Sequence, residues 1–423
     1  MTGRRRPGRR RGGRGGDGGQ PWRLALSIQA ALLQSAWVGA RLMIGYKAVE
    51  LGATGFALGL VAASFAAPAL VAALPVGRLS DRMGGGAKVA LLGVAVFVTG
   101  PVLLCWASEL WILVLAATTT GIGSLFVMIG QQTFTAHRGR DGSSDGSFAV
   151  LTTAASLGQL VGPPVVTLAA SFGAASTSAP NTVVGAITCI VLLLLGLFGT
   201  PTLLNADRRA AAAAREAQAG AARQDARPER RPKLAEIGRG NGLWRSVAVS
   251  AAVLVTVDLL YTFVPLWATE KGVSSVAVGM LLAIRAVVSV FSRVGLSRLV
   301  ARFGRKPLLL VAIACGVAAL IALPFIGAFG AIPVMVALGV ALGLPQPLTM
   351  SWVVRITPKS VHGQALGLRM TANRLAQIVL PLAIGTAAGP LGISVILWAN
   401  AAVLATALII VGGSDIDGAT EQD

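Results

Sequence analysis

The chain has 423 residues, of which 54% are hydrophobic and only 13% are charged. Soluble domains carry about 25% charged residues, so this composition excludes an ordinary cytosolic enzyme and, because it is so apolar, a disordered chain. The remaining class is an integral membrane protein. The formal net charge of +19 is informative mainly through the positions of the basic residues.

Twelve apolar segments are each long enough to cross a bilayer as a helix, which needs about 20 residues. In chain order they cover residues 24–46, 55–77, 87–107, 110–135, 147–172, 182–199, 244–268, 274–298, 307–327, 331–356, 361–387 and 393–411. Several contain proline, which membrane helices tolerate because neighbouring helices satisfy the freed backbone groups. The sequence therefore predicts an all-α integral membrane protein with twelve transmembrane helices.

The basic residues predict the orientation of these helices. Thirty lysines and arginines fall in the N-terminal tail, the middle loop and the other loops of that side, whereas only Lys47 and Lys271 fall on the opposite side. By the positive-inside rule, both termini and the middle loop are expected in the cytoplasm. Arginine far outnumbers lysine, a bias typical of GC-rich bacterial genomes, so we expect a multi-pass protein of a bacterial inner membrane.

The segments outside the spans divide the chain. Residues 1–23, with arginines among glycines, are expected to form a disordered cytoplasmic tail that anchors to anionic lipid headgroups rather than to nucleic acid. Two six-helix bundles are expected at 24–199 and 244–412. Between them lies a basic cytoplasmic linker, 200–243, in which 206–224 favours a surface helix. An acidic cytoplasmic tail follows at 413–423.

The two halves of the chain are an internal repeat. At an offset of 220 residues, five pairs of identical residues match in order: Gly52 with Gly272, Gly59 with Gly279, Arg82 with Arg302, Gly84 with Gly304, and Gly123 with Gly343. At an offset of 218, Gln159 meets Gln377 and Pro163 meets Pro381. Parallel repeats of six spans place a substrate site near the bilayer midplane between the halves, and one half rocks against the other during transport.

A loop motif supports this architecture. Residues 77–84 read Gly-Arg-Leu-Ser-Asp-Arg-Met-Gly, which resembles the loop motif of the major facilitator superfamily. The second copy, 297–306, keeps the basic pair of the motif but lacks its Gly and Asp, whereas the first has Gly85 and Gly86 in place of the basic pair. The resemblance implies a twelve-helix secondary transporter with two pseudo-symmetric bundles. It also implies gating roles for Gly77, Asp81, Arg82, Gly84, Arg302, Gly304 and Arg305, although the basic members could serve only to orient the chain.

The fifth span bears on the direction of transport. Gly158, Gly162 and Pro163 resemble part of a motif found in exporters of the superfamily, although its trailing Gly-Gly is missing; close helix packing and a kink are the alternative interpretation. Ala117 stands where drug exporters of the superfamily carry an arginine, which argues against standard proton–drug antiport. Efflux is slightly favoured, and uptake of a small organic anion is the alternative.

Charges inside membrane spans are costly and mark functional sites. By the repeat, Arg41 and Asp258 are expected to face a shared cavity from opposite halves. Asp258 is the only carboxylate well inside a span, so it could carry a coupling proton, or it could form a static ion pair with Arg285 or Arg374 at the interface between the halves. Arg369 lies nearer the cytoplasm, where it could partner Asp81 as part of the gate.

The remaining cavity candidates are polar or aromatic. The full set is Arg41, Gln34, Trp37, Gln131, Asp258, Tyr261, Gln346, Asn373 and Gln377. Because the embedded charges are mostly arginines, the cavity suits an anionic or zwitterionic solute.

The sequence shows no P-loop, metal-ligand cluster or nucleophile motif, so neither an enzyme nor a cofactor is expected. The predicted function is secondary active transport of a small organic solute by rocker-switch alternating access, with proton-coupled efflux favoured. The expected partners are the substrate, protons and membrane lipids, with no nucleic acid, and the expected state is a monomer. A solute sensor with a transporter-like fold is the alternative from another class.

Overall fold

A computed structural model describes residues 21–53, 55–83, 85–138, 144–220, 242–357, 362–388 and 392–416. These residues form helices joined by short turns, and no strand occurs among them. Helices satisfy their backbone hydrogen bonds within one segment, which the water-free core of a bilayer requires. The apolar runs of the sequence therefore fold as helices.

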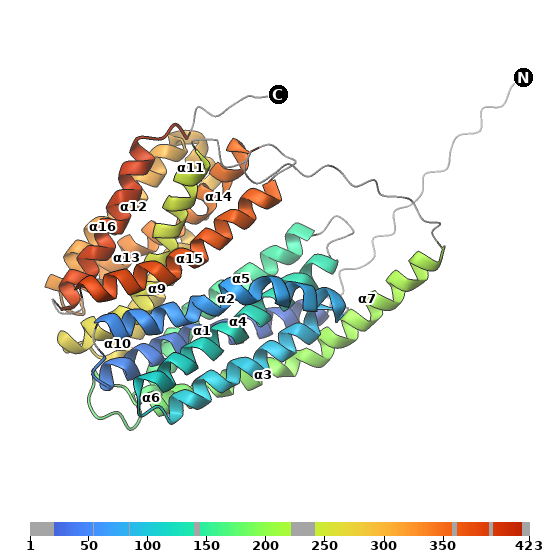
Figure 1. Cartoon of the computed structure of the whole chain (residues 1–423), viewed down its shortest axis with the longest axis horizontal. Helices are drawn as coiled ribbons and strands as arrows, with labels where there is room; N and C mark the ends of the chain where they lie inside the picture. The colour runs from blue at the N-terminus through green and yellow to red at the C-terminus, as the bar shows by residue number, and fades with distance from the viewer. Residues whose placement is uncertain are drawn as a thin grey trace, which may run out of the picture.

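The helices form two groups that lie side by side (Figure 1). The first half contains α1 (Pro21–Glu50), α2 (Gly55–Arg82), α3 (Gly86–Cys105), α4 (Leu110–Arg138), α5 (Ser144–Ala170), α6 (Thr182–Gly196), η2 (Leu197–Gly199) and α7 (Thr200–Gly220). The second half contains α9 (Leu243–Glu270), α10 (Ser275–Phe291), α11 (Leu296–Phe303), α12 (Arg305–Ala322), η3 (Leu323–Phe325), α13 (Ala331–Gly343), α14 (Pro345–Ile356), α15 (His362–Ala388) and α16 (Ile393–Gly412).

Three predicted spans differ from uninterrupted helices of the expected length. The sixth continues through η2 into α7, which begins at Thr200 and includes residues 206–220 of the predicted surface helix; residues 221–224 lie outside the described residues. The eighth breaks between α10 and α11, which are bent by 65°. Gly295, in the left-handed region at φ 75°, lies in this break. The tenth breaks at Leu344, directly before Pro345.

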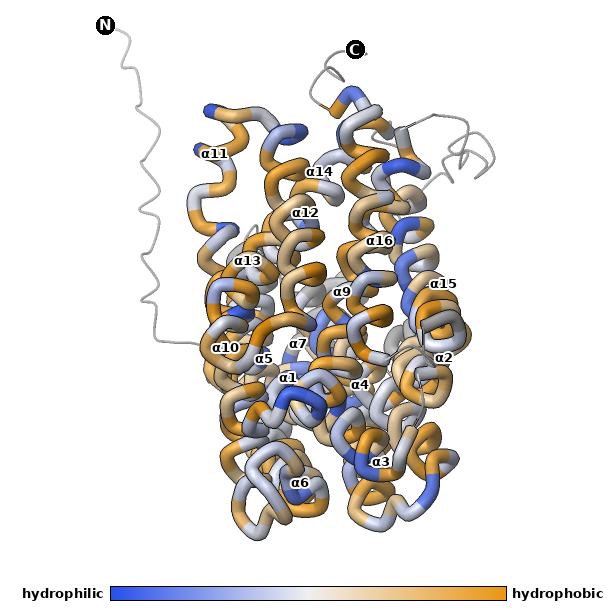
Figure 2. The backbone as a smooth tube through the Cα atoms, turned by 90° about the vertical axis from the view of Figure 1, so that its left-hand side faces the viewer, coloured by the Kyte–Doolittle hydropathy of each residue, from blue (hydrophilic) through white to orange (hydrophobic). Residues whose placement is uncertain are grey.

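The described helices account for the twelve predicted spans. Among the described residues, eight helices are long and apolar enough to cross a bilayer, and the bent pair α10 and α11 makes a ninth. The others are α1, α5 and α15, of which α1 carries Arg41 and α15 carries Arg369 and Arg374. Hydrophobic residues predominate along peripheral helices such as α12 and α16 (Figure 2). Large apolar side chains on these helices, such as Val311 and Ile409, are exposed, as expected of a surface that faces lipid.

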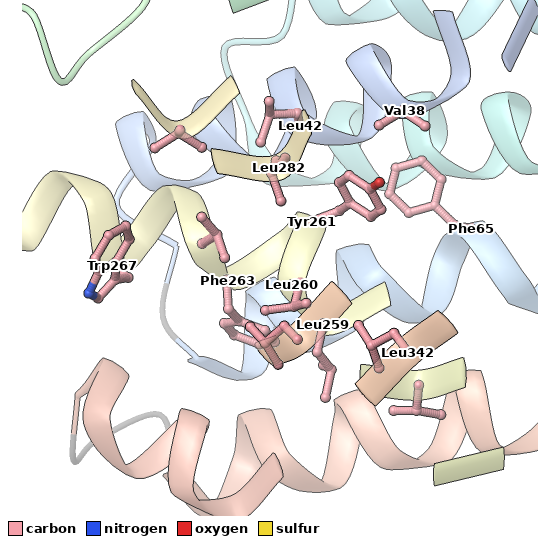
Figure 3. Close-up of a cluster of buried hydrophobic side chains, with 14 of the residues drawn as sticks. Val38, Leu42, Phe65, Leu259, Leu260, Tyr261, Phe263, Trp267, Leu282 and Leu342 are labelled. Atoms are coloured by element: carbon pink, nitrogen blue, oxygen red, sulfur yellow. The ribbon is translucent and has the colours of Figure 1, made fainter. Parts of the chain in front are cut away.

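The main hydrophobic core lies around α9, between the two halves. Tyr261, Phe263 and Trp267 of α9 are each at most 1% exposed. They belong to one cluster with Val38 and Leu42 of α1, Phe65 of α2, Leu282 of α10 and Leu342 of α13 (Figure 3). Helix α9 is therefore enclosed by protein, while the outer helices separate it from lipid.

The halves also meet at two matched contacts. A Cβ added to Gly59 of α2 would lie 2.4 Å from the carbonyl oxygen of Pro381 in α15, and a Cβ added to Gly279 of α10 would lie 2.9 Å from that of Pro163 in α5. Both glycines lie in the first two turns of their helices, at the end of the molecule that carries Lys271. Only glycine permits such close helix approach. The glycines and prolines matched by the internal repeat thus pack against each other across the interface.

Candidate functional site

A cavity of about 510 Å³ lies between the two halves and is lined by residues of both. Eight of the nine predicted cavity residues line it: Gln34, Trp37, Arg41, Gln131, Asp258, Tyr261, Gln346 and Gln377. The ninth predicted residue, Asn373, is not among the residues that line the cavity. Its Nδ2 instead donates to Ser250 Oγ at 3.1 Å, where α15 packs against α9.

The centre of the site is an ion pair between the halves. Arg41 Nη1 in α1 lies 2.5 Å from Asp258 Oδ1 in α9, and the two residues are 3% and 6% exposed. Gln377 of α15 donates from Nε2 to Oδ2 of the same carboxylate. Arg374 Nη1 donates to Gln377 Oε1 at 3.0 Å. One carboxylate therefore links α1, α9 and α15.

Aromatic rings surround the guanidinium of Arg41. Its Cζ lies 5.0 Å from the ring centroid of Trp37, 4.9 Å from that of Phe65 and 5.8 Å from that of Tyr261. Figure 3 shows the Tyr261 and Phe65 side chains next to each other. Rings at these distances attract a cation through their negative faces. They hold the Arg41 side chain in place beside Asp258.

A second arginine contacts Tyr261 from α10. Arg285 Nη2 donates to the Tyr261 hydroxyl at 2.7 Å, and the Arg285 side chain is also buried, at 3% exposed. Among the described residues, Asp258 pairs with Arg41 and forms no ion pair with Arg285 or Arg374, the partners considered from the sequence. Asp258 lies on the side of α9 that faces α1, and Arg41 is the cation there.

The cavity is strongly basic. Four arginines and a single carboxylate line it: Arg41, Arg285, Arg293, Arg374 and Asp258. Arg293 follows the end of α10, and its Nε donates to the Gly343 carbonyl at 3.1 Å. Hydrogen-bond donors and positive charge therefore dominate the polar part of the lining, as suits an anionic group of a ligand.

The family follows from the sequence as a whole. Residues 26–381, most of the chain, match the sequence profile of the Major Facilitator Superfamily. The chain belongs to this superfamily. It is therefore a multi-pass membrane protein and a secondary transporter of a small solute, and not an enzyme. The twelve helices in two halves are the fold of the superfamily.

Solved superfamily structures share this fold. A structure of the nucleoside transporter NupG aligns with a TM-score of 0.71, covering 93% of this chain and 100% of that chain at 13% identity. A D-xylose–proton symporter aligns with a TM-score of 0.68, covering 95% and 100% at 16% identity. A variant of the peptide transporter POT, in complex with sulfate, aligns with a TM-score of 0.70, covering 92% and 93% at 14% identity. At these identities the likeness shows the fold alone. No curated protein sequence matches this chain.

The predicted gating residues that the structure describes are not among those lining the cavity. Gly77 lies in α2, while Gly84 and the side chains of Asp81 and Arg82 fall outside the described residues. In the second copy of the superfamily motif, Arg302 is exposed at the end of α11 and stacks on Phe303 at 5.4 Å. Gly304, at φ 80°, lies between α11 and α12, and Arg305 is the first residue of α12. Arg369 Nη2 donates to Thr349 Oγ1 at 3.2 Å.

An unexpected contact explains why the first motif copy lacks its basic pair. Asp207 of α7 accepts a hydrogen bond from the Ala87 backbone N–H at 2.9 Å, at the start of α3. A Cβ added to Gly85 would lie 2.4 Å from Asp207 Oδ2, and one added to Gly86 would lie 2.1 Å from the Gly130 carbonyl oxygen. Larger residues would collide with the Asp207 carboxylate or with α4. The helix that begins the linker is thus anchored to the first half.

Sequence reasoning missed Phe65, Arg293 and Asp207. Phe65 lies in an unbroken apolar run, and Asp207 lies in the linker. Arg293 was counted among the basic residues of a loop because hydropathy continues across the break after α10. The closely spaced Pro345 and Pro347 were the available signal for an irregular backbone beside it.

Proposed function

We propose that this secondary transporter is coupled to protons through Asp258 and exports a small organic solute by alternating access. The observation that supports this is the buried carboxylate itself. Asp258 is the only acidic residue among those lining the cavity, and it holds partners from both halves. A group that titrates there can change how strongly the halves are linked.

The proposed coupling step is protonation of Asp258. The ionised carboxylate pairs with Arg41 of α1 and accepts from Gln377 of α15, whose Oε1 accepts from Arg374. Arg285 and Tyr261 line the same cavity. Protonation of Asp258 removes the negative charge that pairs with Arg41. The added proton also occupies one of the two carboxylate oxygens that accept hydrogen bonds in the ionised state. Protonation therefore weakens the link between α1 and α9, and deprotonation restores it.

A second candidate is proton-coupled uptake of a small organic anion. The excess of arginines in the cavity supports it, since a bound anion would balance part of that charge. The exporter-like glycines of α5 have a packing role that weakens the case for efflux. A Cβ added to Gly158 would lie 2.3 Å from the Ala31 carbonyl oxygen, and one added to Gly162 would lie 2.7 Å from Ser35 Cα.

The proposed setting is a bacterial inner membrane with both termini in the cytoplasm. The asymmetry of lysine and arginine between the two sides supports this orientation. In that orientation, the matched glycine–proline contacts lie toward the outside of the cell. The cavity then belongs to a state whose halves meet tightly on the outer side.

The test begins with a solute library screened by thermal shift on purified wild type, Asp258→Asn and Glu109→Gln at two pH values. A ligand that binds the native state raises the melting temperature. The expected result is a hit whose binding changes with pH in wild type and in Glu109→Gln, which removes a carboxylate outside the cavity lining, but not in Asp258→Asn. Flux of that hit in proteoliposomes under an imposed pH gradient then gives the direction.

An equal pH response in all three proteins would contradict coupling through Asp258 and leave the carboxylate as a static link between the halves. Flux into the compartment with the lower pH supports exchange of solute for protons. Flux in the same direction as the protons would instead support uptake.

A further inference from the structure

Arg285 is a buried cation without a counter-ion. No carboxylate pairs with it among the described residues, and its only hydrogen-bond partner there is the neutral hydroxyl of Tyr261. Its Nε has no partner although it is fully buried. A buried charge that lacks a partner is strongly destabilising, so the cavity as it stands is electrostatically incomplete.

The neighbouring arginine shows the contrast. Arg41 is equally buried, but its charge is balanced by Asp258 at 2.5 Å. Both guanidinium groups lie close to one ring, with Arg41 Cζ 5.8 Å and Arg285 Cζ 5.4 Å from the Tyr261 centroid. The carboxylate thus pairs with one of the two cations beside Tyr261, and the described part of the chain supplies no counter-ion for the other.

Tyr261 provides a second donor at the same place. Its hydroxyl oxygen accepts from Arg285, so the hydroxyl hydrogen remains available to donate. A phenol that accepts from a guanidinium is a stronger donor, because hydrogen bonds in a chain polarise one another. The Arg285 guanidinium and the Tyr261 hydroxyl, which both line the cavity, together can donate to two oxygens of one anionic group.

We propose that Arg285 and Tyr261 form the subsite for a carboxylate, phosphate or similar oxyanionic group of the transported solute. The rings of Trp37 and Phe65, which also line the cavity, lie on the Arg41 side of Tyr261 and offer a wall for an apolar part of the solute. The inference rests on the proposed function only in calling the bound molecule a substrate. It places the anion on Arg285 and leaves Asp258 and Arg41 for coupling.

The test measures binding of matched probes by thermal shift and by calorimetry at constant ionic strength. Benzoate and benzamide have the same shape and differ in charge, and inorganic phosphate tests a tetrahedral oxyanion. We expect wild type to bind benzoate or phosphate and to bind benzamide at least tenfold more weakly. Tighter binding of benzoate than of phosphate would identify a carboxylate subsite, and tighter binding of phosphate would identify a phosphate subsite.

Three variants distinguish binding at the subsite from a general attraction of anions to the positively charged cavity. Arg285→Gln should lose tenfold or more in oxyanion affinity, and Tyr261→Phe, which keeps the ring beside Arg41, should lose several-fold. Arg293→Gln removes the same charge from the cavity but not from the subsite, so it should keep the preference for the anion. Equal losses in Arg285→Gln and Arg293→Gln would overturn the proposal, as would wild type that binds neither oxyanion or prefers benzamide.

These results are distinct from the coupling test. Asp258→Asn should retain the preference for benzoate over benzamide while losing its pH dependence. Loss of pH dependence together with intact anion preference therefore supports both assignments. Intact pH-dependent flux with no anion preference would retain the coupling role of Asp258 and reject the subsite.

Discussion

The two ends of the interface between the halves differ in symmetry. At one end the contacts are matched, with Gly59 against Pro381 and Gly279 against Pro163. Toward the other end the halves diverge: α2 and α4 run unbroken, whereas their counterparts break into α10 and α11 and into α13 and α14. The repeat is therefore preserved where the halves touch and lost where the second half builds its part of the cavity.

The difference is chemical as well as geometric. The first half contributes one charged residue to the cavity lining, Arg41, whereas the second half contributes Asp258, Arg285, Arg293 and Arg374. Rocking requires surfaces that separate and close again. The glycine–proline contacts can serve this purpose, and each half contributes to them equally. Selecting a solute requires particular charges at particular places, and these charges are concentrated in one half.

The largest effect is expected at the ion pair that crosses the interface. Asp258→Ala leaves Arg41 buried without its counter-ion and should cost about 3–5 kcal/mol of stability. The double variant Arg41→Gln with Asp258→Ala should cost less than the sum of the two single changes, because no unpaired charge remains. Chemical unfolding of the four proteins in detergent gives the double-mutant cycle. Additive costs would show that the pair contributes little to holding the halves together.

Because the two glycine–proline contacts are equivalent in the repeat, we expect substitution of either glycine to have a similar effect on stability and on opening. Gly59→Ala and Gly279→Ala each force backbone or side chains apart across the interface and should each cost about 1–3 kcal/mol. Both should also favour opening at that end, which increased maleimide labelling of Ser275→Cys in a cysteine-free background would report. Gly367→Ala, with nothing within 4 Å of the added Cβ, is the control. A large effect at only one of the two glycines would contradict the equivalence of the two contacts.

The starts of α3 and α12 are equivalent in the repeat, and the residue before each helix is a glycine, Gly85 or Gly304, which has no side chain to cap it. At the start of α3, Asp207 of α7 accepts from the Ala87 N–H instead. Asp207→Ala should cost about 1 kcal/mol, the usual value for loss of an N-terminal cap, and should release α7 from the first half. Asp207→Asn keeps an accepting oxygen and is the matched control. Faster proteolysis of the linker in Asp207→Ala, but not in Asp207→Asn, would support this role. Equal proteolysis of the two variants would contradict it.

Much of the fold follows from the sequence because hydropathy and length determine membrane helices almost alone. The shared cavity of Arg41 and Asp258 also follows, since the repeat places both on facing helices. The pairing partner does not, because the choice among Arg41, Arg285 and Arg374 depends on the rotation of each helix about its axis. The Asp207 cap depends on tertiary packing, and the breaks beside Arg293 and Pro345 interrupt segments whose hydropathy does not change.

The smallest effect tests why the second half breaks. In an unbroken helix the Gly343 carbonyl would accept from the N–H of residue 347, but Pro347 has none, and Arg293 Nε supplies the bond instead at 3.1 Å. Arg293 is partly exposed, so Arg293→Gln should cost only about 0.5–1 kcal/mol. In a Pro347→Ala background, where the backbone can donate, the same change should cost less, whereas Arg298→Gln on α11 should cost the same in both backgrounds. Unfolding measurements that give an equal cost for Arg293→Gln in both backgrounds would show that the arginine does not replace the missing backbone donor, and that the asymmetry between α4 and its broken counterpart has another cause.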